Sequence, residues 1–354
     1  MRVVANILKL FKDSLVAISL FVCCLLSLLG FSPSLKLTQI EPIYTLFVLF
    51  VLIKGLQESH FLEFLASKLE KGSFIAPKMV ALSFFASIFL SIDVTLIALL
   101  PLILLMRLDD KKRLFILVAF TTHLGAALTP FGTPQNLFIF SFYPMTLTEF
   151  IATIAPFSLF LFLLFFILSF LIKEPLKLPP RDSIWDRRKA IFFLALLLFG
   201  IALSLKLLPS YLGVILLIIA LWIDKNAFKV DYALLLTFIL FISISNQIKT
   251  LLTPYLVEIK EPFFITILLS QIVSNVGATL LLHNFTNNAN SLLLASNIGS
   301  FGTPVAALAN LITYKIYYNA TKDSSFLYTM TRYNLLALFI ACLSSILYPQ
   351  CPFP

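Results

Sequence analysis

The sequence predicts an all-α polytopic membrane protein made of inverted repeats, each with a re-entrant helical hairpin and a discontinuous helix. Hydrophobic residues fill 60% of the 354 positions and charged residues only 12%, a balance that soluble domains do not have. The tetrapeptide Phe-Gly-Thr-Pro occurs twice, at 131–134 and 301–304, each time inside a long apolar run. The order of apolar runs around the first copy recurs around the second.

Charge and cysteine content exclude several classes of protein. The formal net charge of +9 does not indicate a nucleic-acid partner, because the Lys and Arg residues lie in short loops between apolar runs. In such loops they orient a membrane protein in the lipid bilayer. The four cysteines form no disulfide framework and the three histidines lack metal-ligand spacing, so we expect no bound cofactor.

Residues 1–172 form the predicted first repeat. It opens with an uncleaved span at 14–31, which lacks a small-residue cleavage site, and a second crossing at 42–56. The run at 79–106 has basic residues on both flanks, so it is expected to enter and leave by the same side as a hairpin with its tip near Asp93. One long tilted helix is the alternative for this run.

The remaining runs of the first repeat lead to the middle of the chain. The run at 114–142 contains the first Phe-Gly-Thr-Pro and is predicted to be a broken helix, because Gly and Pro interrupt helical hydrogen bonding. An uninterrupted span follows at 147–172. A basic, proline-containing segment at 173–189 is the predicted cytoplasmic linker, and 190–210 is an extra transmembrane span.

Residues 211–354 form the predicted second repeat, in the same order as the first. Its predicted elements are crossings at 211–224, 231–252 and 333–348, a hairpin at 262–284 and a broken helix at 289–318. Each repeat crosses the bilayer an even number of times, so the extra span inverts the second copy relative to the first.

Loop charges predict the orientation of the chain. With the N-terminus in the cytoplasm, the basic segments all fall on the cytoplasmic side. These segments are 57–78, 107–113, 173–189, the pair Lys225 and Lys229, and the group Lys315, Lys322 and Arg332. The predicted location is therefore the inner (plasma) membrane of a bacterial-type cell, with multiple passes.

The two breaks carry candidate binding groups. The N-terminus of a resumed helix presents unpaired N–H groups and a partial positive charge, which suit an anion, and the end of the preceding half presents carbonyls that suit a small cation. Matched breaks in two halves are typical of a transporter binding site, whereas a single Pro break is also explained by packing. The candidates are Thr129, Gly132, Thr133 and Asn136 in the first break and Gly299, Gly302 and Thr303 in the second.

The two hairpin tips add further candidates. Asp93 places a carboxylate deep in an apolar run, which is costly and usually functional. It is expected to bind Na⁺ or take a proton, and it is also a candidate cap for the second hairpin arm. The other tip residues are Ser91, Thr95, Ser274 and Asn275, and a sodium site is expected at Asp93 and Asn275.

Two histidines lie near these elements. His123 precedes the first break and is expected either to relay protons or to bond a neighbouring helix. His283, with Asn284 and the asparagines that follow, is interpreted mainly as a polar turn near the outer mouth of the second hairpin.

These motifs resemble the ion transporter superfamily of sodium/divalent-anion symporters, arsenite permeases and citrate transporters. The resemblance is carried by the span at 46–69, Asp93-Val-Thr95, Thr129-Pro-Phe-Gly-Thr-Pro-Gln-Asn136, Asp231 with the leucines after it, and Ser274-Asn-Val-Gly-Ala278. It implies that hairpin side chains and broken-helix carbonyls bind sodium, and that the substrate lies between them. It also implies a part that slides as an elevator against a dimeric scaffold.

The resemblance points to specific positions and has departures. It implies binding roles for Ser91, Asp93, Thr95, Thr133, Asn136, Ser274, Asn275, Gly302 and Thr303. Ile92 stands where the family often has Asn, and Gly277 stands where it has Pro. Ala306 stands where the repeat would place a partner for Asn136, so the two halves are expected to differ.

The predicted function is an ion-coupled secondary transporter of a small anion, driven by Na⁺ or H⁺, with elevator-type alternating access. The alternatives are an arsenite or other oxyanion efflux permease and a sodium/proton antiporter. A channel needs a polar stripe along several helices, and an enzyme needs a catalytic constellation such as paired carboxylates. The sequence has neither, so we expect a protein that is not an enzyme, with a homodimer implied by the resemblance alone.

Overall fold

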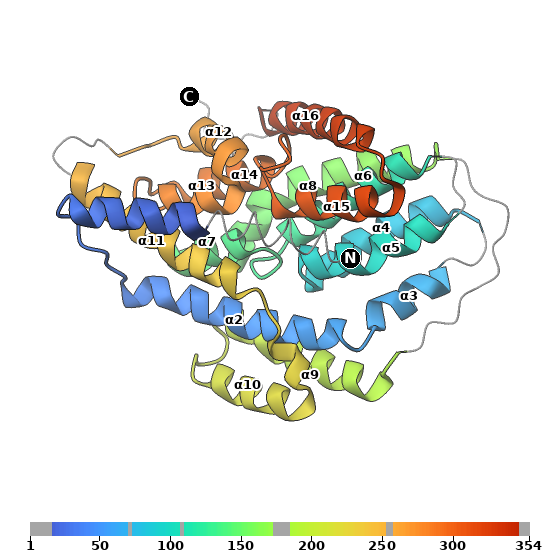
Figure 1. The fold of residues 1–354 in the computed structure, drawn as a ribbon, viewed down its shortest axis with the longest axis horizontal. Helices are drawn as coiled ribbons and strands as arrows, with labels where there is room; N and C mark the ends of the chain where they lie inside the picture. The colour runs from blue at the N-terminus through green and yellow to red at the C-terminus, as the bar shows by residue number, and fades with distance from the viewer. Residues whose placement is uncertain (1–15, 70–72, 107–109, 173–184, 253–257, 347–354) are drawn as a thin grey trace.

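The structure, a computed structural model, describes residues 16–69, 73–106, 110–172, 185–252 and 258–346, and these residues form helices joined by turns (Figure 1). Residues 1–15, with the start of the predicted span at 14–31, and residues 173–184 of the predicted linker lie outside this part of the chain. So do portions of the predicted turns, at 70–72, 107–109 and 253–257, and the end of the predicted last span.

Among the described residues, four helical stretches are long and apolar enough to cross a bilayer. They are α2 (Leu37–Gln57), α8 (Leu147–Ser169), α11 (Tyr232–Leu252) with the η1 turn before it (Lys225–Phe228), and α16 (Ser325–Ile346). Two further apolar helices are α9 (Arg187–Ser204) and α10 (Leu212–Ile223). The 12 residues of α10 extend only about 18 Å, less than the hydrocarbon core, so the inversion of the repeats, which depends on this crossing, stays a prediction.

The predicted hairpins are each divided into two helices. In the first half α4 (Ile75–Phe89) and α5 (Ile92–Leu105) lie side by side and meet at Ser91 (Figure 1). In the second half α12 (Phe263–Val273) and α13 (Asn275–Leu282) meet at Ser274. Whether these pairs re-enter the bilayer depends on where its faces lie, so re-entrancy stays a prediction.

The predicted broken helices are also divided where the tetrapeptides lie. The first consists of α6 (Lys111–Ala127) and α7 (Pro134–Phe142). The second consists of α14 (Ala289–Ile298) and α15 (Leu308–Thr321). A hairpin followed by a helix with a central gap therefore occurs once in each half of the chain.

Three boundaries differ from the prediction. The helix α3 (Phe61–Leu69) forms inside the predicted loop at 57–78, because its apolar face packs on the protein and Phe64 stacks on Trp185 with ring centroids 4.6 Å apart. The basic residues at 187–189 belong to α9, whose N-terminus is capped by the Asp186 carboxylate accepting from the Lys189 N–H. The helix α16 begins at Ser325 rather than near 333, which puts Arg332 inside a helix.

The helices fall into two groups on either side of α2. Figure 1 shows α9 and α10 on one side of α2, and the broken helices on the other. The helix α2 contacts α9 and α10 on the first side and α5, α7 and α11 on the second. It is therefore the boundary between a small outer layer and the part of the molecule that contains the two breaks.

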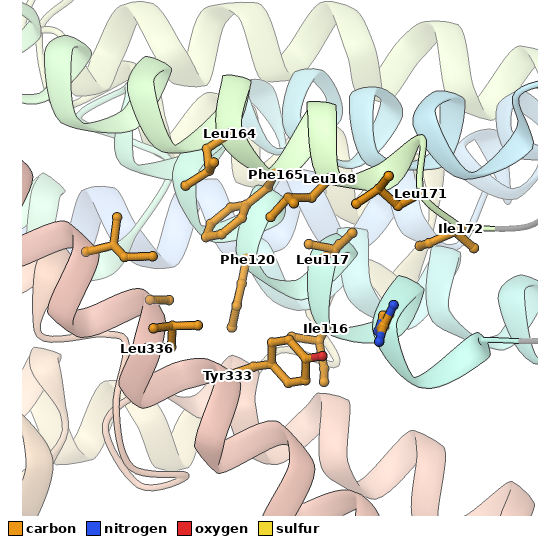
Figure 2. A pocket seen from close by; sticks show the side chains of 13 residues that line it. Ile116, Leu117, Phe120, Leu164, Phe165, Leu168, Leu171, Ile172, Tyr333 and Leu336 are labelled. Atoms are coloured by element: carbon orange, nitrogen blue, oxygen red, sulfur yellow. The ribbon is translucent and has the colours of Figure 1, made fainter.

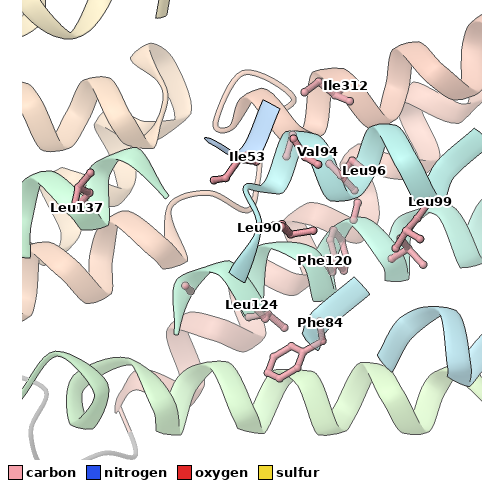
Figure 3. Close-up of a cluster of buried hydrophobic side chains, with 14 of the residues drawn as sticks. Ile53, Phe84, Leu90, Val94, Leu96, Leu99, Phe120, Leu124, Leu137 and Ile312 are labelled. Carbon is pink, nitrogen blue, oxygen red and sulfur yellow. The ribbon is translucent and has the colours of Figure 1, made fainter. Parts of the chain in front are cut away.

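A cluster of buried apolar side chains holds the first hairpin against α6. Figure 3 shows Phe84 of α4, Leu96 and Leu99 of α5 and Phe120 of α6 in this cluster. Each of the four is at most 2% exposed, and Phe84 also stacks on Phe162 of α8 at 3.8 Å between ring centroids. In water, burying a large apolar side chain stabilises a fold by about 1.5–3 kcal/mol. Lipid is itself apolar, so in a bilayer close packing is what stabilises this cluster.

Candidate functional site

The tip of the first hairpin is a helix N-terminus. Ser91 has extended backbone angles, and its Oγ accepts from the Val94 N–H at 3.5 Å, so Ser91 caps α5. Asp93 lies in the first turn of α5 and not at the cap position where we considered it. A carboxylate in that turn is favoured by the positive end of the helix. Thr95 is fully buried and its hydroxyl donates to the Ser91 carbonyl at 3.2 Å, which fixes the tip.

The tip of the second hairpin has a strained backbone. Ser274 has φ 73° and ψ 158°, a conformation that L-residues seldom adopt and that costs about 1–3 kcal/mol. Its Oγ accepts from the Gly277 N–H at 3.3 Å and caps α13. The Asn275 N–H donates to the Ala306 carbonyl at 2.8 Å. The second tip is therefore bonded directly to the second break.

The first break spans the six residues between Ala127 and Pro134. Pro134 is the first residue of α7, where a missing N–H costs nothing, and the Thr133 Oγ1 accepts from the Asn136 N–H at 3.3 Å as its cap. The Asn136 Nδ2 donates back to the carbonyls of Ala127 and Thr129, at 3.2 and 3.4 Å. One amide thus satisfies backbone groups that the interruption has freed.

The second break is longer and is held from outside. Here Phe-Gly-Thr-Pro lies entirely in the loop between α14 and α15, and Gly302 has φ 109°, a value that favours glycine. The Gln271 Nε2 of α12 donates to the carbonyls of Gly299 and Phe301, each at 3.1 Å. Its Oε1 accepts from the Thr303 N–H at 2.8 Å. The second hairpin therefore fastens the second break through one glutamine side chain.

The structural counterpart of Asn136 is Asn310. Each is the third residue of its helix, and the Asn310 Nδ2 donates to the carbonyls of Ser300 and Thr303 at 3.1 and 3.3 Å. The prediction that Ala306 occupies this place is wrong, because α15 starts four residues after its tetrapeptide instead of at its last residue. The breaks are also joined to each other, since the Asn297 Nδ2 donates to the Asn136 Oδ1 at 2.8 Å.

One small cavity of about 70 Å³ lies where the tips and breaks meet. Its lining includes five of the predicted site residues, namely Ser91, Asp93, Gly132, Thr133 and Asn275. It also includes residues 134–135 and 307–309, so the N-termini of α5, α7, α13 and α15 all face it. Each such terminus carries a partial positive charge, although the first N–H groups of α13 already have partners in Ala306, Asn275 and Ser274.

The other predicted site residues do not line this cavity. They are Thr95, Thr129, Asn136, Ser274, Gly299, Gly302 and Thr303. Their hydrogen bonds hold the tips and breaks in place instead. For example, the Thr129 hydroxyl donates to the Ile88 carbonyl of the first hairpin at 3.1 Å, and the Thr303 hydroxyl donates to the Gln271 carbonyl of the second hairpin at 3.0 Å.

His123 is a further polar group at this cavity, and its role was left open between relaying protons and bonding a neighbouring helix. It is 6% exposed, lines the small cavity, and its Nε2 has no hydrogen-bond partner among the described residues. The ring packs near Phe301 of the second tetrapeptide, with centroids 6.0 Å apart. A buried nitrogen of this kind needs a water or ligand partner, so the cavity offers a place for one.

A second cavity, of about 770 Å³, adjoins the first and shares Phe50, Ser91, Asp93 and Leu234 with it. Its charged lining residues are Lys54, Asp93, Lys229, Asp231 and Lys315. It lies along the later halves of α2 and α15, along α5 from its start to Pro101, and at the start of α11. For α2, α11 and α15 these are the helix ends that the loop charges assign to the cytoplasm.

Lys315 lies inside the protein. It was expected on the cytoplasmic side with Lys322 and Arg332, which stays a prediction, and the structure adds that it lies within α15 and is only 6% exposed. The sequence signal was its position inside the predicted broken helix at 289–318. A lysine there is a functional candidate for the same reason as Asp93.

The opposite end of the molecule is closed by a buried polar network. The Gln39 Nε2 of α2 donates to the Asn246 Oδ1 of α11 at 3.1 Å and lies 3.0 Å from the His283 Nε2. The Asn284 Nδ2 also donates to the Asn246 Oδ1, at 2.6 Å. His283 and Asn284 lie in a turn after α13, as interpreted from the sequence, and their side chains join α2, α11 and the end of α13 inside the protein.

A third cavity, of about 170 Å³, differs in chemistry from the other two. Figure 2 shows it between α6, α8 and α16, with Ile116, Phe120, Leu164 and Leu336 around it. Its lining is apolar apart from Arg113 and Tyr333. Most of this space therefore suits a hydrocarbon group.

Comparison with known proteins identifies the family. Residues 4–290 match the Citrate transporter family, CitMHS, which covers most of the chain. The chain belongs to the citrate transporter family. This family lies within the ion transporter superfamily, so the resemblance seen in the motifs is confirmed.

Two relatives agree with this assignment. An uncharacterized transporter of Methanocaldococcus jannaschii is 33% identical over 312 residues, covering 82% of this chain and 85% of the relative. The inner membrane protein YbiR of Escherichia coli is 31% identical over 293 residues, covering 77% of this chain and 79% of the relative. With its apolar helices, the chain is therefore a membrane-embedded transporter.

Proposed function

We propose that this member of the citrate transporter family is an ion-coupled secondary transporter of a small anion, driven by Na⁺ or H⁺. The observation that carries the proposal is the convergence of four helix N-termini on one cavity of about 70 Å³. One terminus comes from each hairpin and one from each broken helix. Discontinuous helices that meet in this way are the recurring form of a transporter binding site.

The cavity has groups for a coupling cation. Side-chain oxygens of Ser91, Asp93, Thr133 and Asn275 belong to residues that line it, and oxygens are the ligands that small hard cations prefer. Its volume suits an ion with a few waters. Asp93 either ligates Na⁺ or takes the proton, and sodium coupling would also use Asn275.

The cavity also has groups for an anion. The N–H groups at the starts of α7 and α15 face it from opposite halves of the chain. Partial positive charges at such termini favour anionic ligands. The unpartnered His123 Nε2 is a further hydrogen-bonding group for either ligand.

The surroundings support alternating access of the elevator type. The wide cavity leads away from the small one on the side assigned to the cytoplasm, while the Gln39–Asn246–His283 network closes the other side. The α9–α10 layer lies beyond α2, apart from the breaks (Figure 1). In our proposal this layer belongs to a static scaffold, paired in a homodimer, and the hairpins and broken helices move.

Uptake into liposomes tests the proposal. The purified full chain is reconstituted, and uptake of citrate, succinate, sulfate, phosphate and arsenite is measured with an inward Na⁺ gradient, an inward H⁺ gradient or neither. We expect gradient-driven uptake of at least one anion, and Asp93→Asn should abolish the gradient dependence. Asp323→Asn, which changes a partly exposed carboxylate that lines neither cavity, should transport like the wild type.

Other outcomes would identify the alternatives. Sodium-driven proton release in the absence of any test anion would indicate a sodium/proton antiporter. Outward movement of arsenite alone would indicate an efflux permease. Equal gradient-driven uptake by the wild type and Asp93→Asn would overturn the role of this carboxylate.

A further inference from the structure

The charges that line the wide cavity are balanced once the carboxylate bonded to one of them is included. Lys54, Lys229 and Lys315 supply three ammonium groups, and Asp93 and Asp231 supply two carboxylates. The Glu58 carboxylate lies 2.8 Å from the Lys54 Nζ and adds the third. Among the described residues at this cavity, positive and negative charges are therefore equal in number while both aspartates are ionised.

Lys315 is the lysine of this set that lies inside the protein. It is 6% exposed in α15, about two turns after the helix start at the small cavity. The other two lie nearer the surface, since Lys54 is 25% exposed and Lys229 is exposed in the turn before α11. The cation that an anion would meet next to the small cavity is therefore Lys315.

Lys315 and Asp93 are on helices that pack together. The helix α15 contacts α5, and both side chains line the same cavity. Charges inside a membrane protein are costly unless they are balanced by opposite charge. The cavity is therefore most stable when its charges sum to zero. A net charge in the cavity favours the binding of an ion of opposite charge.

We propose that Lys315 is the charge contact of the transported anion, and that a cation bound at Asp93 creates the anion site through charge balance. This inference rests on the proposed function and adds its coupling mechanism. Na⁺ or H⁺ at Asp93 cancels one carboxylate and leaves one excess positive charge, which one negative charge of the substrate neutralises. Without the cation, the anion adds to a set that is already balanced and is repelled by Asp93.

The mechanism predicts how loaded and empty forms cross the membrane. The empty cavity and the cavity holding one cation and one anionic charge are both neutral, so both can move through the bilayer at low electrostatic cost. The cavity holding a cation alone or an anion alone carries a net charge and should not cross. Movement of both partners together or of neither is the condition for tight coupling.

Ligand binding by variants tests the proposal. The full chain is purified in detergent, and binding of citrate and of sulfate is titrated by the rise in the thermal unfolding midpoint, with 100 mM choline or sodium chloride and at pH 5.5 or 8. Variants are Asp93→Asn, Lys315→Gln, Lys315→Arg and the double variant Asp93→Asn/Lys315→Gln. Lys322→Gln is the matched control, because Lys322 lies at the end of the same helix and does not line the cavity.

We expect the cation to strengthen anion binding to the wild type, and Asp93→Asn to bind the anion equally well with or without it. Lys315→Gln should weaken anion binding at least about tenfold, in the range for losing one partner of a charge contact, with partial retention in Lys315→Arg. The double variant, which keeps the charges balanced, should fold like the wild type and bind the anion weakly. Lys322→Gln should match the wild type.

Three results would overturn the inference. They are wild-type anion affinity in the double variant, cation-dependent binding that persists in Asp93→Asn, and equal loss in Lys315→Gln and Lys322→Gln. Cation-coupled uptake in liposomes together with any of these would reject the charge-balance mechanism and leave the proposed function standing. Absence of coupled uptake and of a cation effect on wild-type binding would reject both.

Discussion

The two helix breaks share a tetrapeptide but are held in different ways. In the first, Thr133 caps the resumed helix and Asn136 reaches back to the freed carbonyls, so the break is stabilised by its own residues. In the second, α15 starts without a side-chain cap, and Gln271 of the hairpin bonds the loop three times. The Phe-Gly-Thr-Pro tetrapeptide thus lies at the end of the first break and in the middle of the second break.

This difference extends to how each break is joined to its hairpin. The second hairpin is fastened to its break by Gln271, by the Thr303 hydroxyl and by the Asn275 N–H, so these segments form one unit. The first hairpin contacts its break through the Thr129 hydroxyl, and it carries Asp93 at its tip. We infer that the second break is fastened to its hairpin by more hydrogen bonds than the first break is.

The largest expected effect comes from filling the first break. A Cβ at Gly132 would overlap the Ala126 carbonyl oxygen, a backbone atom that cannot rotate away. Gly132→Ala should therefore lower stability by about 3 kcal/mol or prevent folding, as expected for an overpacked interior. Gly277→Ala is the control, since its Cβ would meet only side chains, the Phe241 ring at 3.2 Å and Val273 Cγ2 at 3.4 Å. Folded yield and the thermal midpoint in detergent measure both, and equal behaviour would contradict the assignment.

The next effect compares the two asparagines. Asn136→Ala should cost about 2–4 kcal/mol, because two buried carbonyls and the Asn297 amide each lose a partner. Asn310→Ala should cost about 1–3 kcal/mol, because it frees two carbonyls. Thermal midpoints in detergent should place the Asn136 variant lower. The reverse order would show that the second break depends more on its own residues than we infer.

Sequence patterns predicted where the helices are interrupted, but not which side chains hydrogen-bond to the interrupted segments. Gly, Pro and Ser-Asn interrupt the apolar runs. Their local effect on the backbone is strong enough to predict the helix breaks near 128–133 and 299–307. Asn310 was missed because aligning the tetrapeptides assumes equal break lengths. Gln271 was missed because a single amide within an apolar helix has no pattern until the fold brings Gly299 and Phe301 beside it.

The same reasoning explains Lys315 and Asn275. A lysine near the end of an apolar run is easily counted with the loop charges, and only the packing around α15 shows that Lys315 is buried. Asn275, by contrast, was placed correctly at the cavity because the tip motif fixes its own position. Local signals therefore predict positions along the chain, whereas contacts between distant segments need the tertiary structure.

A smaller effect separates the two hairpins. Gln271→Leu should cost about 1–3 kcal/mol, since the Gly299 and Phe301 carbonyls lose a buried partner. Thr129→Val removes one bond, to the Ile88 carbonyl, and should cost about 0.5–1.5 kcal/mol. Hydrogen exchange at 299–307 in the first variant and at 128–133 in the second reports the local opening. If both variants raised hydrogen exchange by the same amount, the second break would not be held by its hairpin more firmly than the first.

The smallest effect concerns the ion pair that links the two broken helices at the end assigned to the cytoplasm. The Lys112 Nζ of α6 lies 2.6 Å from the Asp323 carboxylate after α15, and both side chains are about one-third exposed. Hydrogen bonds from Lys112 and Ser325 lower the pKa of Asp323 to about 2. Because this pKa is lower in the folded chain than the usual value near 4, the pair stabilises the fold above about pH 4 and is lost as pH falls towards 2.

Asp323→Asn should therefore lower the thermal midpoint slightly at pH 7 and low salt, less than any variant above, because exposed pairs are weak and screened. The gap between wild type and variant should narrow as the pH is lowered from 6 to 3 and as salt is raised. A gap that widens on acidification would mean that Asp323 is stabilised in its protonated form. The two broken helices would then be joined at this end by contacts other than charge.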